Sequence, residues 1–225
     1  MSKTILSTKT LKPHQKELVL NSGLGLVSYD AIAIQFIPFT LDLNTDYFII
    51  TSKNSAKALL NYLNLNPHKK AAFSIPICCV GTKTSGYLTD NGFTIARMAH
   101  YGKELATYIT TNLKDKRFTF LAGNLRRNEI PELLAEANVS LKEIICYHTI
   151  AQPKLFERNF DGILLFSPSG VDSFTTKNSF DGAVAFCIGN TTATEAKKYT
   201  DKIIIANKPT VENVLVQAIK TLNYA

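Results

Sequence analysis

The sequence predicts an α/β protein made of two similar domains with parallel sheets. Short apolar runs that end in small polar turns alternate with helix-like segments, which is typical of buried strands followed by helices. The pattern occurs twice: the run from Cys79 to Thr84 closely matches the run from Cys187 to Thr192. A chain of 225 residues also has the length of two domains of about 100 residues each.

The elements follow from the same signals in chain order. Apolar runs predict the strands, while helical spacing, hydroxylated residues and proline at helix starts, and glycine at helix ends predict the helices. The predicted strands are 4–8, 26–36, 47–50, 77–80, 93–96, 118–122 and 143–150, with helices at 13–21, 52–63, 84–90, 102–113 and 129–137. A loop is predicted at 67–70. The second copy of the pattern runs from residue 162 to the end, with apolar runs at 162–166 and 183–188.

The repeat is incomplete at both ends, which predicts how the domains are connected. The segment 1–36 has no counterpart ahead of the second copy, and the elements of 117–150 do not recur after residue 222. An insertion accounts for both gaps. Residues 1–36 and 153–225 would form one discontinuous domain, with 37–152 inserted as the other. The predicted domains are flavodoxin-like three-layer units, and two crossings of the chain, near residues 34–40 and 147–155, would join them and permit hinge motion.

Composition narrows the functional classes. The net charge of +7 is spread over both predicted domains, and it suits either a solvated surface or an anionic ligand. No basic stripe interleaved with aromatic residues is present, so nucleic acid is not the expected partner. The four cysteines lie in apolar runs and do not cluster with the four histidines. This pattern predicts buried free thiols in a reducing compartment and no metal site. Without a signal-peptide pattern or an apolar run of membrane-spanning length, we expect a cytoplasmic monomer that does not contact a membrane.

Polar residues follow the predicted strands, where parallel sheets place their ligands. Helix starts predicted at Ser52, Thr84, Ser167 and Thr192 would present backbone N–H groups and hydroxyls suited to carboxylates. The substrate-binding residues predicted on this basis are Ser52, Lys53, Thr84, Ser167, Ser169, Gly189, Thr191 and Thr192. Lys53, Lys83, Arg126 and Arg127 could add positive charge to the site, or could only solvate the surface.

Five motifs together resemble the uroporphyrinogen-III synthase family over essentially the whole chain. They are Thr51-Ser52, Val80-Gly81-x-x-Thr84, Tyr147-His148-Thr149, Phe166-Ser167-Pro168-Ser169-Gly170 and Ile188-Gly189-x-Thr191-Thr192. The resemblance implies two such domains joined by a two-stranded connector, and a cofactor-independent lyase of tetrapyrrole (haem) biosynthesis. Its substrate would be hydroxymethylbilane, which loses water and closes with inversion of ring D to give uroporphyrinogen III.

The resemblance also implies a catalytic residue, Tyr147, because the tyrosine of the family lies in this motif. A phenol with an ordinary pKa near 10 can donate a proton to a departing hydroxyl at neutral pH. An alternative interpretation is a tyrosine that only packs in the connector. Two other functions remain open at this stage. One is a hinge-type two-domain binding protein for a small anion, and the other is a nucleotide-binding enzyme, although no Gly-x-Gly-x-x-Gly or P-loop motif occurs.

Overall fold

The computed structural model describes residues 3–224, and its contacts divide the chain into two compact units. The terminal unit comprises the chain up to residue 33 together with residues from 150 onward, and the inserted unit comprises residues 34–149. The boundaries predicted from the sequence, after 36 and before 153, lie three residues further along the chain than these divisions. That the two units are autonomous domains stays a prediction.

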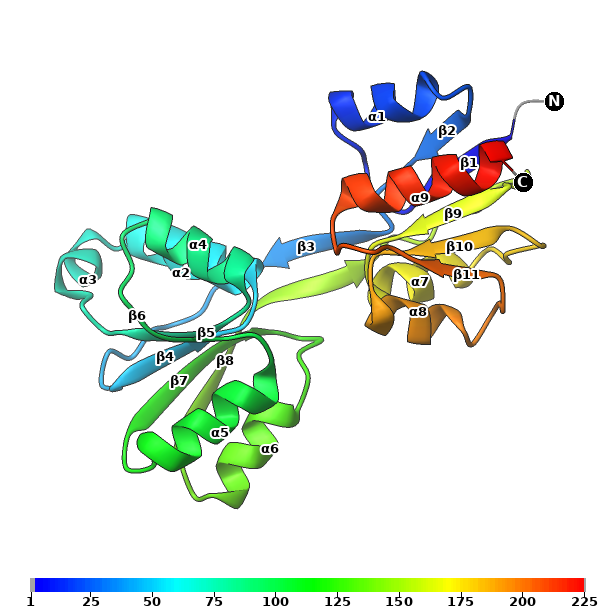
Figure 1. Cartoon of the computed structure of the whole chain (residues 1–225). Helices are drawn as coiled ribbons and strands as arrows, with labels where there is room; N and C mark the ends of the chain where they lie inside the picture. The colour runs from blue at the N-terminus through cyan, green and yellow to red at the C-terminus, as the bar shows by residue number, and fades with distance from the viewer. Residues whose placement is uncertain (1–2, 225) are drawn as a thin grey trace. The chain divides into compact units, whose positions relative to one another are not determined.

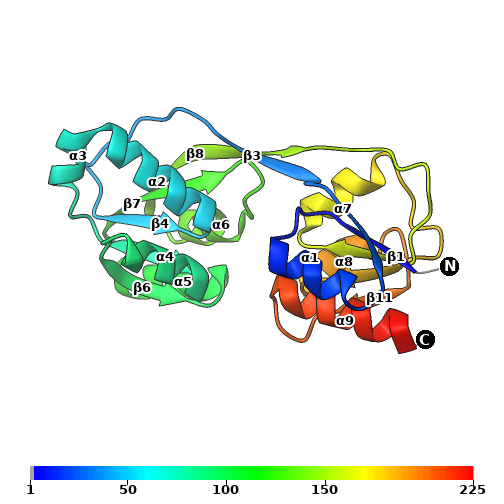
Figure 2. The same ribbon diagram turned by 90° about the horizontal axis from the view of Figure 1, so that it is seen from above.

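The terminal unit is a five-stranded parallel sheet between two pairs of helices. The strand order is β11-β10-β9-β1-β2. Helices α1 and α9 cover one face and α7 and α8 the other (Figure 1). Both ends of the described chain lie in this unit (Figure 2). Its elements are β1 (Thr4–Ser7), α1 (Pro13–Leu20), β2 (Gly25–Ser28), β9 (Gly162–Leu165), α7 (Pro168–Thr175), β10 (Val184–Cys187), α8 (Asn190–Ala196), β11 (Ile203–Ile205) and α9 (Val211–Tyr224).

The inserted unit is a six-stranded sheet in the order β3-β8-β7-β4-β5-β6. Helices α2 and α4 cover one face and α5 and α6 the other (Figure 1). Its elements are β3 (Ile32–Phe36), β4 (Tyr47–Ile50), α2 (Lys53–Leu65), α3 (Pro67–Ala72), β5 (Ile77–Val80), α4 (Thr82–Asp90), β6 (Ile95–Ala99), α5 (Gly102–Asn112), β7 (Arg117–Gly123), α6 (Glu129–Glu136) and β8 (Ser140–Ala151).

The two sheets share one spatial arrangement but start it at different strands. Strands β4, β5 and β6 of the inserted unit take the places that β9, β10 and β11 take in the terminal unit, and β7 and β8 take those of β1 and β2. Counted along its own chain, the terminal unit has the flavodoxin-like order 2-1-3-4-5. The inserted unit is a cyclic permutation of that order, with β3 added at its edge. The repeated motifs at Gly81 and Gly189 accordingly precede corresponding helices, α4 and α8.

The apolar cores explain why the strands are continuous runs of hydrophobic residues. Parallel sheets covered on both faces bury their central strands, as β1 and β9 show by burying all four of their residues. The four cysteines belong to these buried strands as free thiols, as predicted. Burial raises the pKa of the Cys78 and Cys187 thiols to about 12, so both are protonated at neutral pH.

The strand predicted at 26–36 is wrong as a single element, because the chain turns after β2. The Asp30 carboxylate accepts hydrogen bonds from the amide and hydroxyl of Thr10, each at 2.9 Å, and the Ala31 amide donates to the Thr8 carbonyl. Beyond this turn, β3 pairs with β8. The Ile37 amide donates to Cys146 and the Gln152 amide donates to Ala31. Residue numbers therefore rise on one strand as they fall on the other, so this connecting pair is antiparallel.

The loop predicted at 67–70 is instead the start of helix α3. Pro67 occupies the first helical position, where its missing N–H leaves no helical hydrogen bond unmade. The Lys69 ammonium donates to the Leu41 carbonyl at 2.9 Å and to the Tyr62 hydroxyl at 2.7 Å. These contacts attach the helix to the segment that leads into β4.

The two-unit division predicts where a core mutation acts. Leu164 is 0% exposed at the centre of the terminal sheet, so Leu164→Ala should lower the free energy of unfolding by about 3 kcal/mol. Amide hydrogen exchange should show lost protection in the terminal unit while the inserted unit stays protected. The matched control is Leu20→Ala on α1, where the side chain is 55% exposed and the expected change is about 0.5 kcal/mol or less. Equal loss of protection in both units would mean that they unfold together.

Candidate functional site

The candidate site lies at the carboxyl edge of the inserted sheet, where β4 and β7 end side by side. From β4 the sheet continues through β5 and β6 on one side and through β7 and β8 on the other. Such a switch in direction is where open α/β sheets bind ligands. A hollow of about 280 Å³ opens here, lined by Thr51, Ser52, Val80, Gly102, Phe120, Gly123, Leu125, Arg126, Arg127, Glu129, Ile130 and Tyr147.

Tyr147 reaches this hollow because of a register shift between β7 and β8. Ala122 pairs with Ile145, but the next residue, Gly123, pairs with Tyr147, so β8 has one extra residue at this point. The displaced residue is Cys146, whose buried thiol donates to the Ala122 carbonyl at 3.4 Å. Such shifts re-aim side chains at sheet ends, and this one brings the half-buried Tyr147 ring over Gly123.

Gly123 gives the Tyr147 ring its place. A Cβ atom at Gly123 would stand 2.7 Å from the phenol oxygen and would overlap the ring carbons beside it. The three nearest atoms all belong to the Tyr147 side chain, so a larger residue would displace the tyrosine. Gly123, the last residue of β7, is a site residue that was not predicted from the sequence.

Ser52 joins Tyr147 to the start of helix α2. Its backbone is extended and its hydroxyl accepts a hydrogen bond from the Ser55 amide at 3.0 Å, as in an N-cap. The same hydroxyl oxygen lies 3.2 Å from the Tyr147 hydroxyl and 3.0 Å from the Ser55 hydroxyl. The structure thus brings together two of the predicted site residues, Ser52 and Tyr147, and adds the buried Ser55.

The other residues predicted in the inserted unit do not line the hollow. Lys53 is exposed, and its ammonium lies 4.7 Å from the centre of the Tyr87 ring. Thr84 is only 6% exposed, because helix α4 begins earlier than predicted: its N-cap is Gly81, and Thr84 is the third helical residue. Gly81 has a φ of 86°, a conformation that a side chain would strain.

Charged residues surround the hollow and continue into a second one of about 670 Å³ at the start of α5. Arg126 pairs with Glu143 and donates to the Asn128 side chain at 2.5 Å, so it is held within the protein. Arg127 is exposed and lines both hollows, together with Glu129. The second hollow is lined by Val80, His100, Tyr101, Gly102, Lys103, Glu104, Thr107, Arg127 and Glu129.

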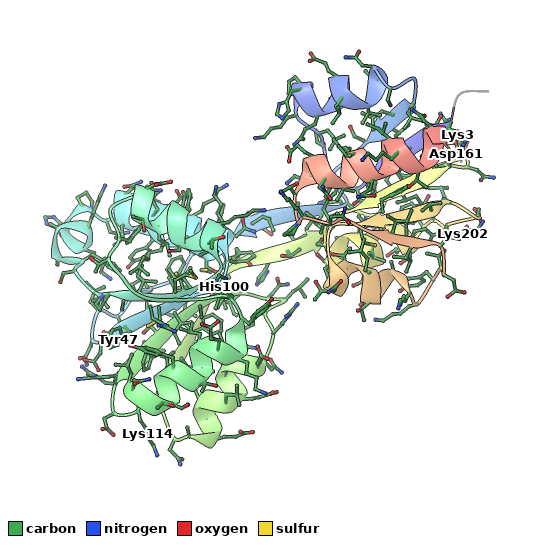
Figure 3. All side chains as sticks on the ribbon, in the orientation of Figure 1. Lys3, Tyr47, His100, Lys114, Asp161 and Lys202 are labelled. Atoms are coloured by element: carbon green, nitrogen blue, oxygen red, sulfur yellow. The ribbon has the colours of Figure 1, made fainter. Side chains whose placement is uncertain are left out.

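Figure 3 shows the position of this edge. His100, which follows β6, lies at the carboxyl edge of the inserted unit, whereas Tyr47 and Lys114 lie at its opposite end. The polar and charged groups described above therefore gather at one edge of the sheet.

The predicted residues of the terminal unit lie at the corresponding carboxyl edge of its own sheet. Ser167 is the N-cap of α7, as predicted, and accepts from the Gly170 amide at 3.1 Å, with the Ser169 hydroxyl 3.2 Å away. Pro168 occupies the first helical turn. Next to this cap, the Thr8 hydroxyl donates to the Leu164 carbonyl at 2.7 Å and ties β1 to β9.

The last three predicted residues lie at the start of α8, but not as predicted. Gly189, with extended backbone, is the N-cap, and helix α8 begins at Asn190. Thr191 is exposed on the first turn, whereas Thr192 is 1% exposed. The helix starts predicted at Thr84 and Thr192 are therefore wrong in the same way. Each lies two residues after the first helical residue and three after the N-cap. In both copies glycine precedes the helix and the buried threonine packs inside it.

The chemistry available at the inserted edge is hydrogen-bond donation to an oxygen. A phenol, a serine hydroxyl and an exposed guanidinium surround a hollow whose lining is partly apolar, through Val80, Phe120 and Leu125. Within residues 3–224, no three His, Cys, Asp or Glu side chains converge as metal ligands would. In the same described part of the chain, none of the helices has both the length and the apolar character needed to cross a membrane.

Comparison with known proteins gives one consistent result. The family model described as uroporphyrinogen-III synthase HemD matches residues 22–215. A porphyrin biosynthesis protein HemD from Ruminiclostridium josui is 22% identical, over 96% of this chain and 49% of that protein. The uroporphyrinogen-III synthase of Saccharomyces cerevisiae is 28% identical, over 59% of this chain and 58% of that protein. The chain thus spans about half the length of the curated relatives it matches.

Solved structures agree on the fold. The crystal structure of uroporphyrinogen-III synthetase from Helicobacter pylori has a TM-score of 0.74 and 21% identity, covering 98% of this chain and 100% of that one. A mutant uroporphyrinogen III synthase from Thermus thermophilus has a TM-score of 0.70 and 14% identity, with 99% of each chain covered. Because the family model matches most of the sequence, this chain belongs to the uroporphyrinogen-III synthase family.

Proposed function

We propose that this chain is a uroporphyrinogen-III synthase, which converts hydroxymethylbilane to uroporphyrinogen III with loss of one water. Family membership supports the reaction, and one geometric observation supports the site. The Tyr147 phenol is held between Gly123 and Ser52 at the switch point of the inserted sheet, facing a hollow with a partly apolar lining. A pyrrole ring that carries carboxylates needs that combination of apolar surface and polar donors.

Tyr147 is the proposed general acid. The carbon–oxygen bond of the terminal hydroxymethyl group breaks with its electron pair on oxygen, and the phenol proton moves to that oxygen, so that water leaves. The pyrrole left behind is an electrophilic azafulvene. Ring D attacks it through its substituted carbon, and the resulting spiro intermediate fragments and recloses with ring D inverted. The ring D carbon that forms the last bond loses its proton, which balances the proton that Tyr147 gave to the departing water. The reaction is a redox-neutral loss of water, so the proposal includes no cofactor.

The remaining polar residues have the proposed role of holding carboxylates. Thr191, Ser169 and Lys53 keep accessible polar groups near helix starts at the carboxyl edges of their own sheets. For Thr84 and Thr192, burial favours a packing role inside the first turn of the helix instead. Gly189 and Ser167 would contribute through the backbone N–H groups of the helices that they cap.

The decisive experiment is an assay with fresh hydroxymethylbilane that separates isomer III from isomer I. We expect the purified chain to give isomer III, whereas spontaneous closure gives isomer I. A hinge-type protein that only binds a small anion would leave the spontaneous rate and the isomer I product unchanged, and that outcome would exclude the proposed function.

Removal of the phenol should reduce turnover more than stability. Tyr147→Phe keeps the ring against Gly123 but removes the proton donor, so kcat should fall roughly 100-fold or more with KM little changed. The matched control is Tyr29→Phe in the terminal unit. The Tyr29 hydroxyl is buried with no hydrogen-bond partner among residues 3–224, so its loss should leave kcat unchanged. Steady-state kinetics on both folded variants measures this difference. Near-normal turnover by Tyr147→Phe would exclude Tyr147 as the acid.

Binding of a polycarboxylate should weaken as salt rises. The chain carries a net charge of +7, and salt at about 0.1 M screens charges beyond roughly 10 Å. KM for hydroxymethylbilane should therefore increase steadily between low and high ionic strength while kcat stays nearly constant. A KM that is flat across this range would assign the carboxylates to uncharged donors, the hydroxyls and helix N–H groups.

A further inference from the structure

The Ser52 hydroxyl is fully engaged inside the inserted unit. It accepts from the Ser55 amide at 3.0 Å and lies within hydrogen-bond distance of two other hydroxyls, those of Ser55 at 3.0 Å and Tyr147 at 3.2 Å. A serine hydroxyl has one proton to donate and two positions at which to accept. These three partners occupy all of them, so Ser52 has no position left for the substrate carboxylate that the sequence analysis assigned to it.

Ser55 continues the series of hydroxyls into the core. It is 0% exposed, and its second neighbour is the Cys146 thiol. Burial raises the pKa of that thiol to about 11, so at neutral pH the sulfur carries its own proton and needs none from Ser55. The thiol's own proton goes to the Ala122 carbonyl. The hydroxyls of Tyr147, Ser52 and Ser55 thus form one series that begins at the hollow and ends at a buried sulfur.

Helix capping does not account for the Ser55 hydroxyl. Helix α7 of the terminal unit starts with the same cap, in which Ser167 accepts from the amide three residues later at 3.1 Å. That residue is Gly170, which has no side chain. The cap therefore forms without a hydroxyl at this position, and the buried hydroxyl of Ser55 has another role.

We infer that Ser55 and Ser52 are positioning residues that direct the proton of Tyr147 toward the substrate. The inference rests on the proposed function. Ser55 donates to Ser52, and Ser52, which already accepts from the Ser55 amide, donates to the Tyr147 oxygen. The phenol then has its own proton free for the departing hydroxyl. In the opposite direction, Tyr147 would donate to Ser52 and could not act as the acid.

The same arrangement stabilises the products of the proton transfer. When the carbon–oxygen bond breaks and water leaves, the pyrrole carries a positive charge and Tyr147 a negative one. The phenolate keeps the hydrogen bond from Ser52, which is strengthened by the charge. Ser52 also caps the amino end of α2, a helix of 13 residues whose dipole favours negative charge at that end.

The test is a double-mutant cycle on kcat with Ser52→Ala and Ser55→Ala. Ser55→Ala keeps the amide that Ser52 caps, so we expect a folded enzyme whose kcat falls roughly tenfold with KM within about twofold. The share of isomer I should rise, because unassisted closure competes. Because Ser55 acts through Ser52, the double variant should be no slower than Ser52→Ala alone. Ser52→Thr keeps the cap and the hydroxyl and should restore kcat.

The matched control is Thr45→Val in the same unit. The Thr45 hydroxyl is also buried and lies 3.0 Å from the Arg117 carbonyl and 3.2 Å from that of Tyr47, before the start of β4. Its removal should lower stability and leave kcat and the isomer ratio unchanged.

The outcomes separate the inference from the proposed function. If the unmodified chain gives no isomer III, the proposed function and the inference both fail. If the unmodified chain is active but Ser55→Ala keeps its kcat, or if the two substitutions add, the function stands and the inference is overturned. A drop in kcat at constant KM, without additivity and with Thr45→Val unaffected, supports the inference.

Discussion

Parallel strand pairing is the constraint on which the rest of this structure depends. Within each sheet the central strands run parallel to one another. The carboxyl ends of β4, β5, β7 and β8 therefore reach the same edge of the inserted unit. Parallel strands also require a crossover for each connection, and the helices that make these crossovers cover both faces. The cores are therefore largely apolar, and polar side chains concentrate where the strands stop. The position of the candidate site follows from this geometry before any residue is given a role.

The cyclic permutation between the units shows how one arrangement supports two different edges. Ser52 and Ser167 cap corresponding helices in the same way, but their surroundings differ. In the inserted unit the end of β7 supplies Gly123, β8 supplies Tyr147, and a hollow opens. In the terminal unit the Thr8 hydroxyl bonds across to Leu164 at the equivalent strand junction. The asymmetry lies in the side chains beyond the strands rather than in the sheets.

Local signals in the sequence predicted most of the fold and part of the site. The caps at Ser52 and Ser167 were predictable because a serine before a helix bonds to its own turn. The starts of α4 and α8 were not predictable, because glycine serves as the cap and a buried threonine three residues later resembles one. The break between β2 and β3 depends on a carboxylate bound by Thr10, and the Gly123–Tyr147 contact depends on a register shift between strands. Both are pairings between segments distant in sequence, which a single sequence does not reveal.

The discontinuous terminal unit has a consequence for synthesis on the ribosome. All residues of the inserted unit have been made by residue 149, and its strands can pair at once. Strand β1 cannot complete its pairing at that stage. The carbonyl that accepts the hydrogen bond from the Thr8 hydroxyl belongs to Leu164, 156 positions further along the chain. Until β9 emerges, the four buried residues of β1 have β2 as a partner on one side only. The nascent chain therefore exposes an apolar sheet edge for most of its elongation, and this is the state that chaperones would meet.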